Sequence, residues 1–276
     1  MFHMPVSGLA GLVLLLVCAH AAPAQDFSVY SRIWDARTPP APQKAGKLLG
    51  RSTSLFHAGK GYDRLDSGNQ MTIFEPAQER FVIIDESRKL TTVITFEHIE
   101  NCLFEATKKT EQHIAELKPQ PDPKAQSLAA LLRFQLNPQF NTTFDAKQNR
   151  LNLSSQFLSY DVKCSRHDSE NAIAAYLDYA DWAARLNYLL NDKALLPGPR
   201  LALDDMLRDR QLLPVEVTLH TRNDDGLHLR AEHRFTWDLD SADMKKIVYW
   251  DKLLASRSLK EVPPARFFEI ETADRR

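Results

Sequence analysis

Histidine and glutamate side chains lie on the polar side of the last predicted hairpin, and their types and spacing could support metal chemistry. If this hairpin turns about Asp224, His220 and His228 face each other there. Glu216 and Glu232 share that side and could supply oxygens. A structural metal site needs four ligands and a catalytic site usually needs three, so we favour a solvated polar pair as the explanation of this pattern. The sequence therefore predicts no metal site and leaves open whether the histidine pair binds an ion.

A third histidine lies on the opposite, apolar face of the same hairpin. His233 falls between Ala231 and Phe235. A buried imidazole needs a hydrogen-bond partner. Two interpretations remain: His233 is a hydrogen-bonded histidine of the core, or it forms part of the wall of a ligand cavity.

Motifs of four common enzyme classes are absent from the chain. It contains no G-x-S-x-G, H-E-x-x-H, G-x-x-x-x-G-K-[ST] or G-x-G-x-x-G. A catalytic triad needs no local motif, so a hydrolase that uses histidine and carboxylates stays open. No pattern indicates a cofactor, and we assign no catalytic residue.

Several carboxylates lie beside predicted turns or helix ends. We interpret five of them as strand ends in solvent: Asp63, Asp66, Glu75, Asp85 and Glu86. Asp204 and Asp205 lie near the start of a short predicted helix, where the helix dipole favours negative charge. None of these carboxylates is assigned a catalytic role.

The composition excludes two broad classes of protein. The 35 Lys and Arg residues nearly balance the 36 Asp and Glu residues, giving a net charge of −1 and no cationic excess for nucleic acid. A hydrophobic content of 43% excludes a disordered chain. A chain of 276 residues can bury a large core without a cofactor.

The amino terminus has the features of a signal peptide. The apolar run at 8–17 is followed by small residues suited to signal peptidase. Ala22-Pro23-Ala24 is the first choice of cleavage site, and Ala19-His20-Ala21 is the second. The run is shorter than the roughly 20 residues that span a bilayer, and the residue before Cys18 does not fit a lipoprotein signal. We expect no stable transmembrane anchor and a periplasmic or secreted protein.

Two cysteines remain after the predicted leader, Cys102 and Cys164. In an oxidising compartment an even number of cysteines is typical of a disulfide. A helix that carries Cys102 and packs on a sheet that carries Cys164 could bring the two thiols together. The sequence predicts a disulfide between them, and two buried free thiols are the alternative.

Short strands separated by turn residues begin near residue 50. Such spacing is typical of an antiparallel meander, because parallel strands need longer crossovers. The predicted strands are Arg51–His57, Lys60–Leu65, Gln70–Phe74, Phe81–Asp85 and Leu90–Thr95.

Helical periodicity then replaces the alternation. Apolar residues recur every three or four positions over 96–117, which predicts a helix with one buried face. Ser169 and Glu170 begin a second long helix that reaches Leu190 and is apolar nearly all round. Residues 27–36 fit a strand or a helix. The other predicted elements are a helix at Gln126–Leu136, strands at Arg150–Ser155 and Phe157–Cys164, a short helix ending at Leu212, the last hairpin, and a helix from Asp240 or Ser241 to about Arg257.

These elements divide the chain into four parts. We predict a signal peptide at 1–24, an N-terminal segment and linker at 25–49, a single α+β domain at 50–257 and a polar C-terminal tail at 258–276.

The early meander resembles the opening of the periplasmic lipoprotein-carrier families, which localise lipoproteins to the outer membrane. The similar stretches are Ser54-Leu-Phe-His-Ala-Gly-Lys-Gly-Tyr-Asp63, Met71-Thr-Ile-Phe-Glu-Pro76, Arg80-Phe-Val-Ile-Ile-Asp85 and Leu90-Thr-Thr-Val93. The resemblance implies an antiparallel, strongly curved sheet, a half-barrel, with helices over its concave face. The predicted helices at 96–136 and 169–212 depart from that pattern. The chain also resembles exported proteins of unknown function that share this architecture.

A curved apolar sheet that helices cover incompletely leaves a cavity for an acyl chain or a similar group. We therefore expect an exported binding or carrier protein without catalytic chemistry, whose partner is a lipid or an acylated protein. The alternatives are a cell-envelope structural or assembly factor with a filled core, and an exported hydrolase. The expected cavity wall comprises Met71, Ile73, Tyr160, His233, Phe235 and Trp237.

Overall fold

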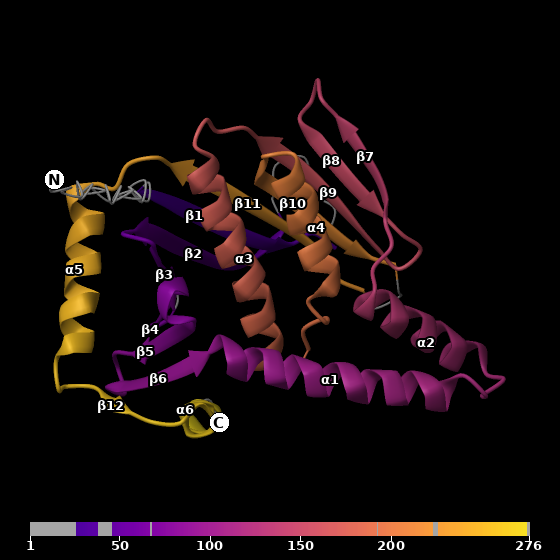
Figure 1. Ribbon diagram of the computed structural model, residues 1–276, viewed down its shortest axis with the longest axis horizontal. Helices are drawn as coiled ribbons and strands as arrows, with labels where there is room; N and C mark the ends of the chain where they lie inside the picture. The colour runs from indigo at the N-terminus through magenta and orange to yellow at the C-terminus, as the bar shows by residue number, and fades with distance from the viewer. Residues whose placement is uncertain (1–25, 38–45, 67, 192, 223–225, 275–276) are drawn as a thin grey trace, which may run out of the picture.

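A computed structural model describes residues 26–37, 46–66, 68–191, 193–222 and 226–274. The predicted signal peptide and both candidate cleavage sites lie outside the described residues, as do residues 25 and 38–45 of the predicted N-terminal segment and linker. The described chain forms a 12-stranded sheet with helices laid against it (Figure 1).

The sheet is open and almost entirely antiparallel. Its strand order is β12-β6-β5-β4-β3-β2-β1-β11-β10-β9-β8-β7, and only β12 pairs in parallel, with β6. The predicted α+β class with a mainly antiparallel sheet is confirmed. The strands are β1 (Phe27–Asp35), β2 (Lys47–His57), β3 (Lys60–Leu65), β4 (Gln70–Glu75), β5 (Arg80–Asp85), β6 (Leu90–Thr95), β7 (Asn141–Asp145), β8 (Arg150–Ser154), β9 (Leu158–Ser165), β10 (Leu213–Thr221), β11 (His228–Thr236) and β12 (Lys260–Glu261).

The meander at β2–β6 matches the predicted strands. Consecutive strands pair with their neighbours through tight connections. Between β2 and β3, Ala58 and Gly59 both adopt positive φ, at 49° and 76°. Two successive positive φ values are the requirement of a two-residue hairpin turn whose twist matches that of its strands. The Ala58-Gly59 pair therefore sets the register in which Ser54 faces Asp63.

β1 occupies the centre of the sheet. It pairs with β2 on one side and with β11 on the other, so its residues are matched with partners about 200 positions later in the chain. The sequence left this segment open between strand and helix. In the structure it is the strand that joins the β2–β6 meander to the half of the sheet formed by β7–β11 (Figure 1).

Side-chain caps begin the long helices where the sequence predicts them. Thr95 Oγ1 accepts from the His98 amide at the start of the first helix, and Ser169 Oγ accepts from Ala172 at the start of the third. Asp240 accepts from two amides at the start of the fifth. The helices are α1 (Phe96–Leu117), α2 (Pro123–Leu136), α3 (Glu170–Leu190), α4 (Gly198–Asp209), α5 (Ser241–Ala255) and α6 (Pro264–Asp274), with a 3-10 turn, η1 (Pro76–Gln78).

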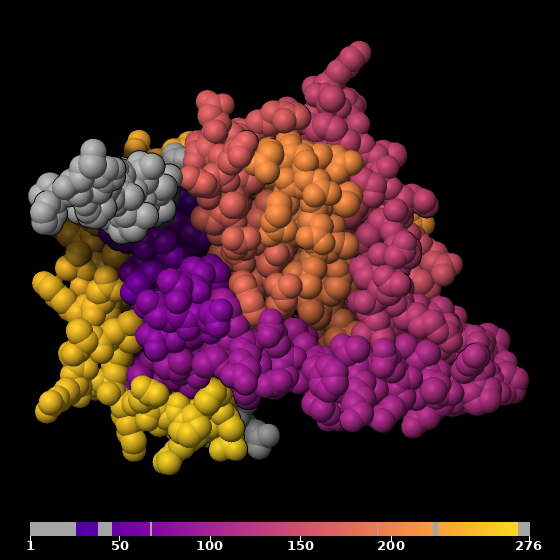
Figure 2. All heavy atoms as spheres, viewed as in Figure 1, coloured from indigo at the N-terminus to yellow at the C-terminus, as the bar shows by residue number. Residues whose placement is uncertain are grey.

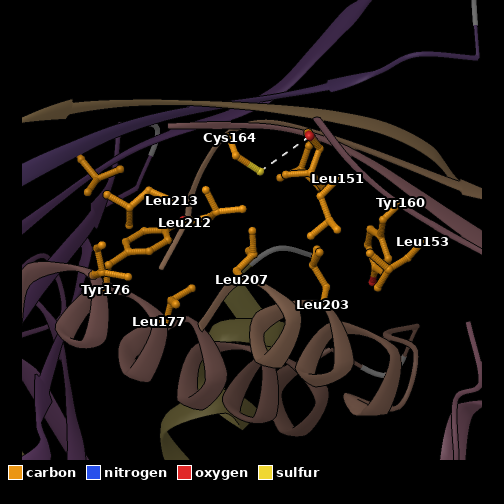
Figure 3. Close-up of a cluster of buried hydrophobic side chains, with 14 of the residues drawn as sticks. Leu151, Leu153, Tyr160, Cys164, Tyr176, Leu177, Leu203, Leu207, Leu212 and Leu213 are labelled. Carbon is orange, nitrogen blue, oxygen red and sulfur yellow. Dashed lines mark hydrogen bonds between the residues drawn. The ribbon is translucent and has the colours of Figure 1, made fainter. Parts of the chain in front are cut away.

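Different helices cover the two faces of the sheet. We call the face that packs against α3 and α4 the inner face. Figure 2 shows α3 and α4 side by side over the centre of the molecule. Figure 3 shows Tyr176, Leu177, Leu203 and Leu207 of these helices pointing toward side chains of the strands. α5 packs on the opposite, outer face through Ile247 and Trp250, over the meander strands.

The predicted disulfide is absent. Cys102 and Cys164 are both free thiols. Cys102 lies on α1, which follows β6, and its Sγ lies 3.8 Å from His98 Nε2 one helical turn away. Cys164 lies on β9 and points into the inner core, where its Sγ contacts the Val162 carbonyl at 3.7 Å (Figure 3). The prediction was wrong because α1 packs near the β6 end of the sheet, whereas β9 belongs to its other half.

The closing residues belong to the folded structure. Residues 258–276, expected as a polar tail, contain β12 and α6. Phe267 of α6 is fully buried, and the Arg88 guanidinium lies 4.8 Å from the centre of its ring. Phe267 joins the core cluster of β4–β6. Within the described part of the chain, no helix is both long enough and apolar enough to cross a bilayer.

Candidate functional site

A cavity of about 610 Å³ lies between the inner face of the sheet and α3, and the connection from α3 to α4 completes its wall. This volume falls within the range of roughly 300–1,000 Å³ that is usual for small-molecule sites. The residues of the wall come from β1, β2, β3, β9, β10, β11 and α3, and from the segment 191–200.

One end of the cavity is apolar. There β10 contributes Val217 and Leu219, and β11 contributes Leu229 and Ala231. On the helix side the wall consists of small residues, because Ala180, Ala183 and Ala184 of α3 face the cavity. Alanines on a helix that packs against leucines and valines leave space that larger side chains would fill. The cavity therefore results from the small residues on this stripe of α3.

The opening of the cavity lies near the carboxyl end of α3. Ile33 and Leu227 line the cavity and are 40% and 39% exposed, high values for large apolar side chains. Asn187, Asn191 and Lys193 also line it and are exposed. An apolar ligand can therefore approach this rim from solvent.

The other end of the cavity carries a carboxylate. Asp63 on β3 is paired across the strands with Ser54 on β2, and Ser54 Oγ donates to Asp63 Oδ1 at 2.5 Å. Tyr179 of α3 hydrogen-bonds to the same carboxylate. Burial raises the pKa of Asp63, and the hydrogen bonds from Ser54 and Tyr179 only partly offset this effect.

A serine and a histidine meet in the middle of the cavity wall. Ser31 on β1 faces His233 on β11, and Ser31 Oγ lies 2.8 Å from His233 Nδ1. His233 Nε2 is buried and has no hydrogen-bond partner among the described residues. Burial and the nearby positive charge of Arg200 lower the pKa of His233 to about 4. The imidazole is therefore neutral at physiological pH.

An ion pair between the partly exposed Arg200 and the buried Asp204 closes the α4 side. Arg200 donates to both carboxylate oxygens of Asp204, with Nε and Nη2 each at 2.9 Å. Asp204 is fully buried. Burial lowers the pKa of Arg200, but the charge of Asp204 and its hydrogen bonds raise it more, so the net shift is upward. Burial also raises the pKa of Tyr160 and of Tyr176 to about 12, which keeps both phenols neutral.

Two of the expected wall residues, Tyr160 and His233, line this cavity. Phe235 and Trp237 lie on the same face but fill the neighbouring core. Their rings stack on each other at 5.5 Å, and Trp237 stacks on His167 at 3.6 Å.

Met71 and Ile73 lie on the opposite face of the sheet. Both are buried beneath α5, in a cluster with Trp250. This placement follows because successive side chains of a strand point to opposite faces of the sheet. Ile73 pairs with Tyr62 on the outer face, whereas Phe74 pairs with Gly61 on the inner face. The structure therefore separates Met71 and Ile73 from the cavity that Tyr160 and His233 line.

His220 and His228 are directly paired across β10 and β11, as expected, and their ring centres lie 5.1 Å apart. The expected turn about Asp224 lies outside the described residues. Glu216 and Glu232 are also paired, but both bind Arg230. Among the described residues, no group of three or more metal-ligand side chains comes together.

The sequence did not predict that several polar residues are enclosed: Asp63 lines the cavity with intermediate exposure, and Glu75, Asp85 and Asp204 are buried. Asp63, Glu75 and Asp85 were expected as strand ends in solvent. Glu75 and Asp85 are only 4% and 5% exposed and are held by arginines, with Lys60 also pairing with Glu75. Asp204 lies within α4 rather than at its start, one turn after Arg200, and the i, i+4 spacing of opposite charges is the signal that could have identified this pair.

No model of a known protein family matches the chain, and no curated protein matches it significantly.

Proposed function

We propose that this protein is an exported binding or carrier protein for an apolar, lipid-like moiety, which occupies the cavity between the inner face and α3. The observation that carries the proposal is the cavity itself, about 610 Å³ with an apolar end formed by β10 and β11. Burial of an apolar chain there would contribute about 25 cal/mol for each Å² removed from water. The partner is a free lipid or the acyl chain of an acylated protein.

Export and the half-barrel architecture belong to the same proposal. The apolar run and the Ala22-Pro23-Ala24 motif support cleavage of a leader and a periplasmic or secreted location. An open antiparallel sheet with α3 and α4 over one face supports the resemblance to the lipoprotein carriers. A strongly curved sheet would let this face wrap farther around a bound chain.

The cavity favours binding over a purely structural role. A structural or assembly factor needs a filled core, and natural cores contain few voids larger than a water molecule. A space of this size beside Leu219 and Leu229, open at Ile33 and Leu227, supports a ligand instead.

A hydrolase is the second candidate, because Ser31 and His233 lie within hydrogen-bond distance inside the cavity. Nucleophilic catalysis needs a base with a pKa near the working pH, and usually a third group that orients it. The pKa of His233 is lowered to about 4, and no described residue hydrogen-bonds to its Nε2. These features favour binding. A Ser31→Ala variant that abolished hydrolysis of a fatty-acyl p-nitrophenyl ester by the purified protein would reverse this preference.

The binding proposal is tested by titrating the purified protein with 1-decanol in a calorimeter. We expect saturable binding, and a loss of about tenfold or more in affinity for Ala183→Phe, which fills the alanine wall of the cavity. Ala255→Phe makes the same change at the exposed end of α5 and should leave affinity unchanged. A wild-type protein that binds no decanol, and retains no lipid in native mass spectrometry after purification from its host, would contradict the proposal.

A further inference from the structure

Asp63 is a cavity carboxylate without a cationic partner. Among the described residues its hydrogen bonds come from Ser54 and Tyr179, and no Lys, Arg or His forms an ion pair with it. The two cationic residues of the cavity wall do not pair with Asp63. Arg200 is neutralised by Asp204, and Lys193 is exposed at the rim.

An unpaired carboxylate in this position has an energetic cost. Removing an ionised carboxylate from water is unfavourable unless it is paired, and otherwise its pKa shifts until it is neutral. The pKa of Asp63 is raised for this reason. Of the groups that face it, Ser54 on β2 and Thr72 on β4 do not titrate, and Tyr179 on α3 has a pKa raised well above its ordinary value. A cation bound beside Asp63 would supply the charge partner that the described residues do not provide.

The strand order separates Asp63 from the apolar end of the cavity. Asp63 lies on β3, whereas Val217 and Leu219 lie on β10, with β2, β1 and β11 between. Four strand spacings amount to about 19 Å. A ligand that binds beside Asp63 and points toward the apolar end must be elongated, with a polar head near β3 and an apolar chain that runs toward β11 and β10.

Aromatic rings next to Asp63 also suit a cationic head. Tyr179 packs edge-on against Phe56 and Phe74, with ring centres 5.4 and 5.7 Å apart, which fixes its phenol beside the carboxylate. Aromatic faces attract ammonium groups, more strongly when water is excluded. Asp63 and Tyr179 together form a small end wall that presents a carboxyl group and an aromatic ring.

We propose that Asp63 binds the protonated amine of an amphiphilic ligand whose alkyl chain extends into the apolar end of the cavity. This inference rests on the proposed binding function and specifies its ligand class. Binding converts Asp63 to its ionised form by forming an ion pair with the ammonium group. Where Asp63 is protonated in the free protein, its proton is released to solvent.

The test compares three probes of equal chain length, 1-decylamine, 1-decanol and decanoate, in calorimetric titrations below their micellar concentrations. At pH 7.5 we expect the amine to bind about tenfold or more tightly than the alcohol, and decanoate to bind most weakly. Lowering the pH to 4.5 should weaken binding of the amine but leave the alcohol unchanged, because only the amine needs the ionised carboxylate.

Asp63→Asn should abolish the preference for the amine and keep the affinity for decanol. Asp161→Asn makes the same change on β9, at a carboxylate paired with Arg150 outside the cavity, and should preserve the preference. Equal affinity of the wild-type protein for amine and alcohol would overturn the inference while leaving the proposed function in place. Failure of all three probes to bind would overturn both. The wild-type comparison needs no variant to fold.

Discussion

Ser31 and His233 face each other across β1 and β11, 202 residues apart in the chain, and Ser31 Oγ lies 2.8 Å from His233 Nδ1. This contact couples the first described strand to the last long strand inside the cavity wall. It also holds a neutral imidazole beside the positive charge of Arg200.

His233 should make the fold sensitive to acid. Its pKa is about 4 in the folded protein and about 6.5 when unfolded, so the unfolded chain binds the proton more readily. Well above pH 6.5 the imidazole is neutral in both states, so its protonation does not change the free energy of unfolding. Stability falls as the pH drops from about 6.5 toward 4, by at most about 3 kcal/mol.

Urea unfolding of the wild type and of His233→Asn at pH 7.5 and pH 4.5 measures this effect. The carboxylates of the protein contribute to the pH dependence of both proteins. The relevant quantity is therefore the difference between the stability lost by the wild type and the stability lost by the variant. We expect the variant to lose less stability on acidification. Equal losses would show that His233 is protonated as easily in the folded protein as in the unfolded one.

Removing the partner of Arg200 should destabilise the fold strongly. Asp204→Asn leaves the Arg200 charge without its fully buried counterion, which typically costs about 3–5 kcal/mol. Asp205→Asn is the matched control, because Asp205 is 67% exposed and pairs with Arg208 at the surface. The control should cost less than about 1 kcal/mol. Equal free energies of unfolding for the two variants, measured in urea, would refute this assignment.

Ile73 should contribute to stability and not to ligand binding. It is fully buried beneath α5, so Ile73→Ala should cost about 2–5 kcal/mol. Leu219→Ala removes a partly exposed side chain from the cavity wall, and should weaken decanol binding at a smaller cost in stability. Chemical unfolding and calorimetry on both variants test the two effects. A loss of decanol affinity in Ile73→Ala at intact stability would place Ile73 in the ligand site.

Both cysteines should be accessible to a thiol reagent once the chain is unfolded, because neither forms a disulfide. In a chain that begins at Gln25, unfolded without reductant, a thiol reagent should label Cys102 and Cys164. In the folded protein Cys102 should react first. Cys164 is buried, and burial raises its pKa to about 11, which suppresses the reactive thiolate. Absence of labelling in the unfolded chain would restore the disulfide.

The sequence predicts local structure well where one periodicity dominates. The stripe of 96–117 gives α1 with the expected bounds, and the Ser169 cap gives α3. In the last hairpin, polar and apolar residues alternate on a sheet with one solvated face, so the pairing of His220 with His228 follows from the pattern.

Assignment to a face of the sheet fails where both faces are covered. In β4 and β5 nearly every residue is buried, because α5 covers one face and the α1, α3 and α6 cluster covers the other. The alternation of apolar and polar residues then does not show which face of the sheet a side chain lies on. The sequence therefore could not place Met71 and Ile73 on the opposite face from Phe74.

The polar residues of the cavity depend on tertiary contacts that a single sequence does not contain. Asp63 has the neighbours of an ordinary turn-proximal carboxylate, and only the packing of Tyr179 from α3 encloses it. The cysteine pairing failed for a related reason. Local periodicity gives the face of a helix, but it does not give the part of the sheet against which that helix packs.

The central position of β1 has a consequence for the assembly of the protein. Its pairing with β11 must wait until about 200 further residues have been synthesised, and contacts so distant in sequence slow folding. A nascent chain that stops before His228 exposes one backbone edge of β1 and one of β10, each able to recruit strands from other molecules. Truncated products of this protein should therefore aggregate, whereas the complete chain buries both edges through its last long strand.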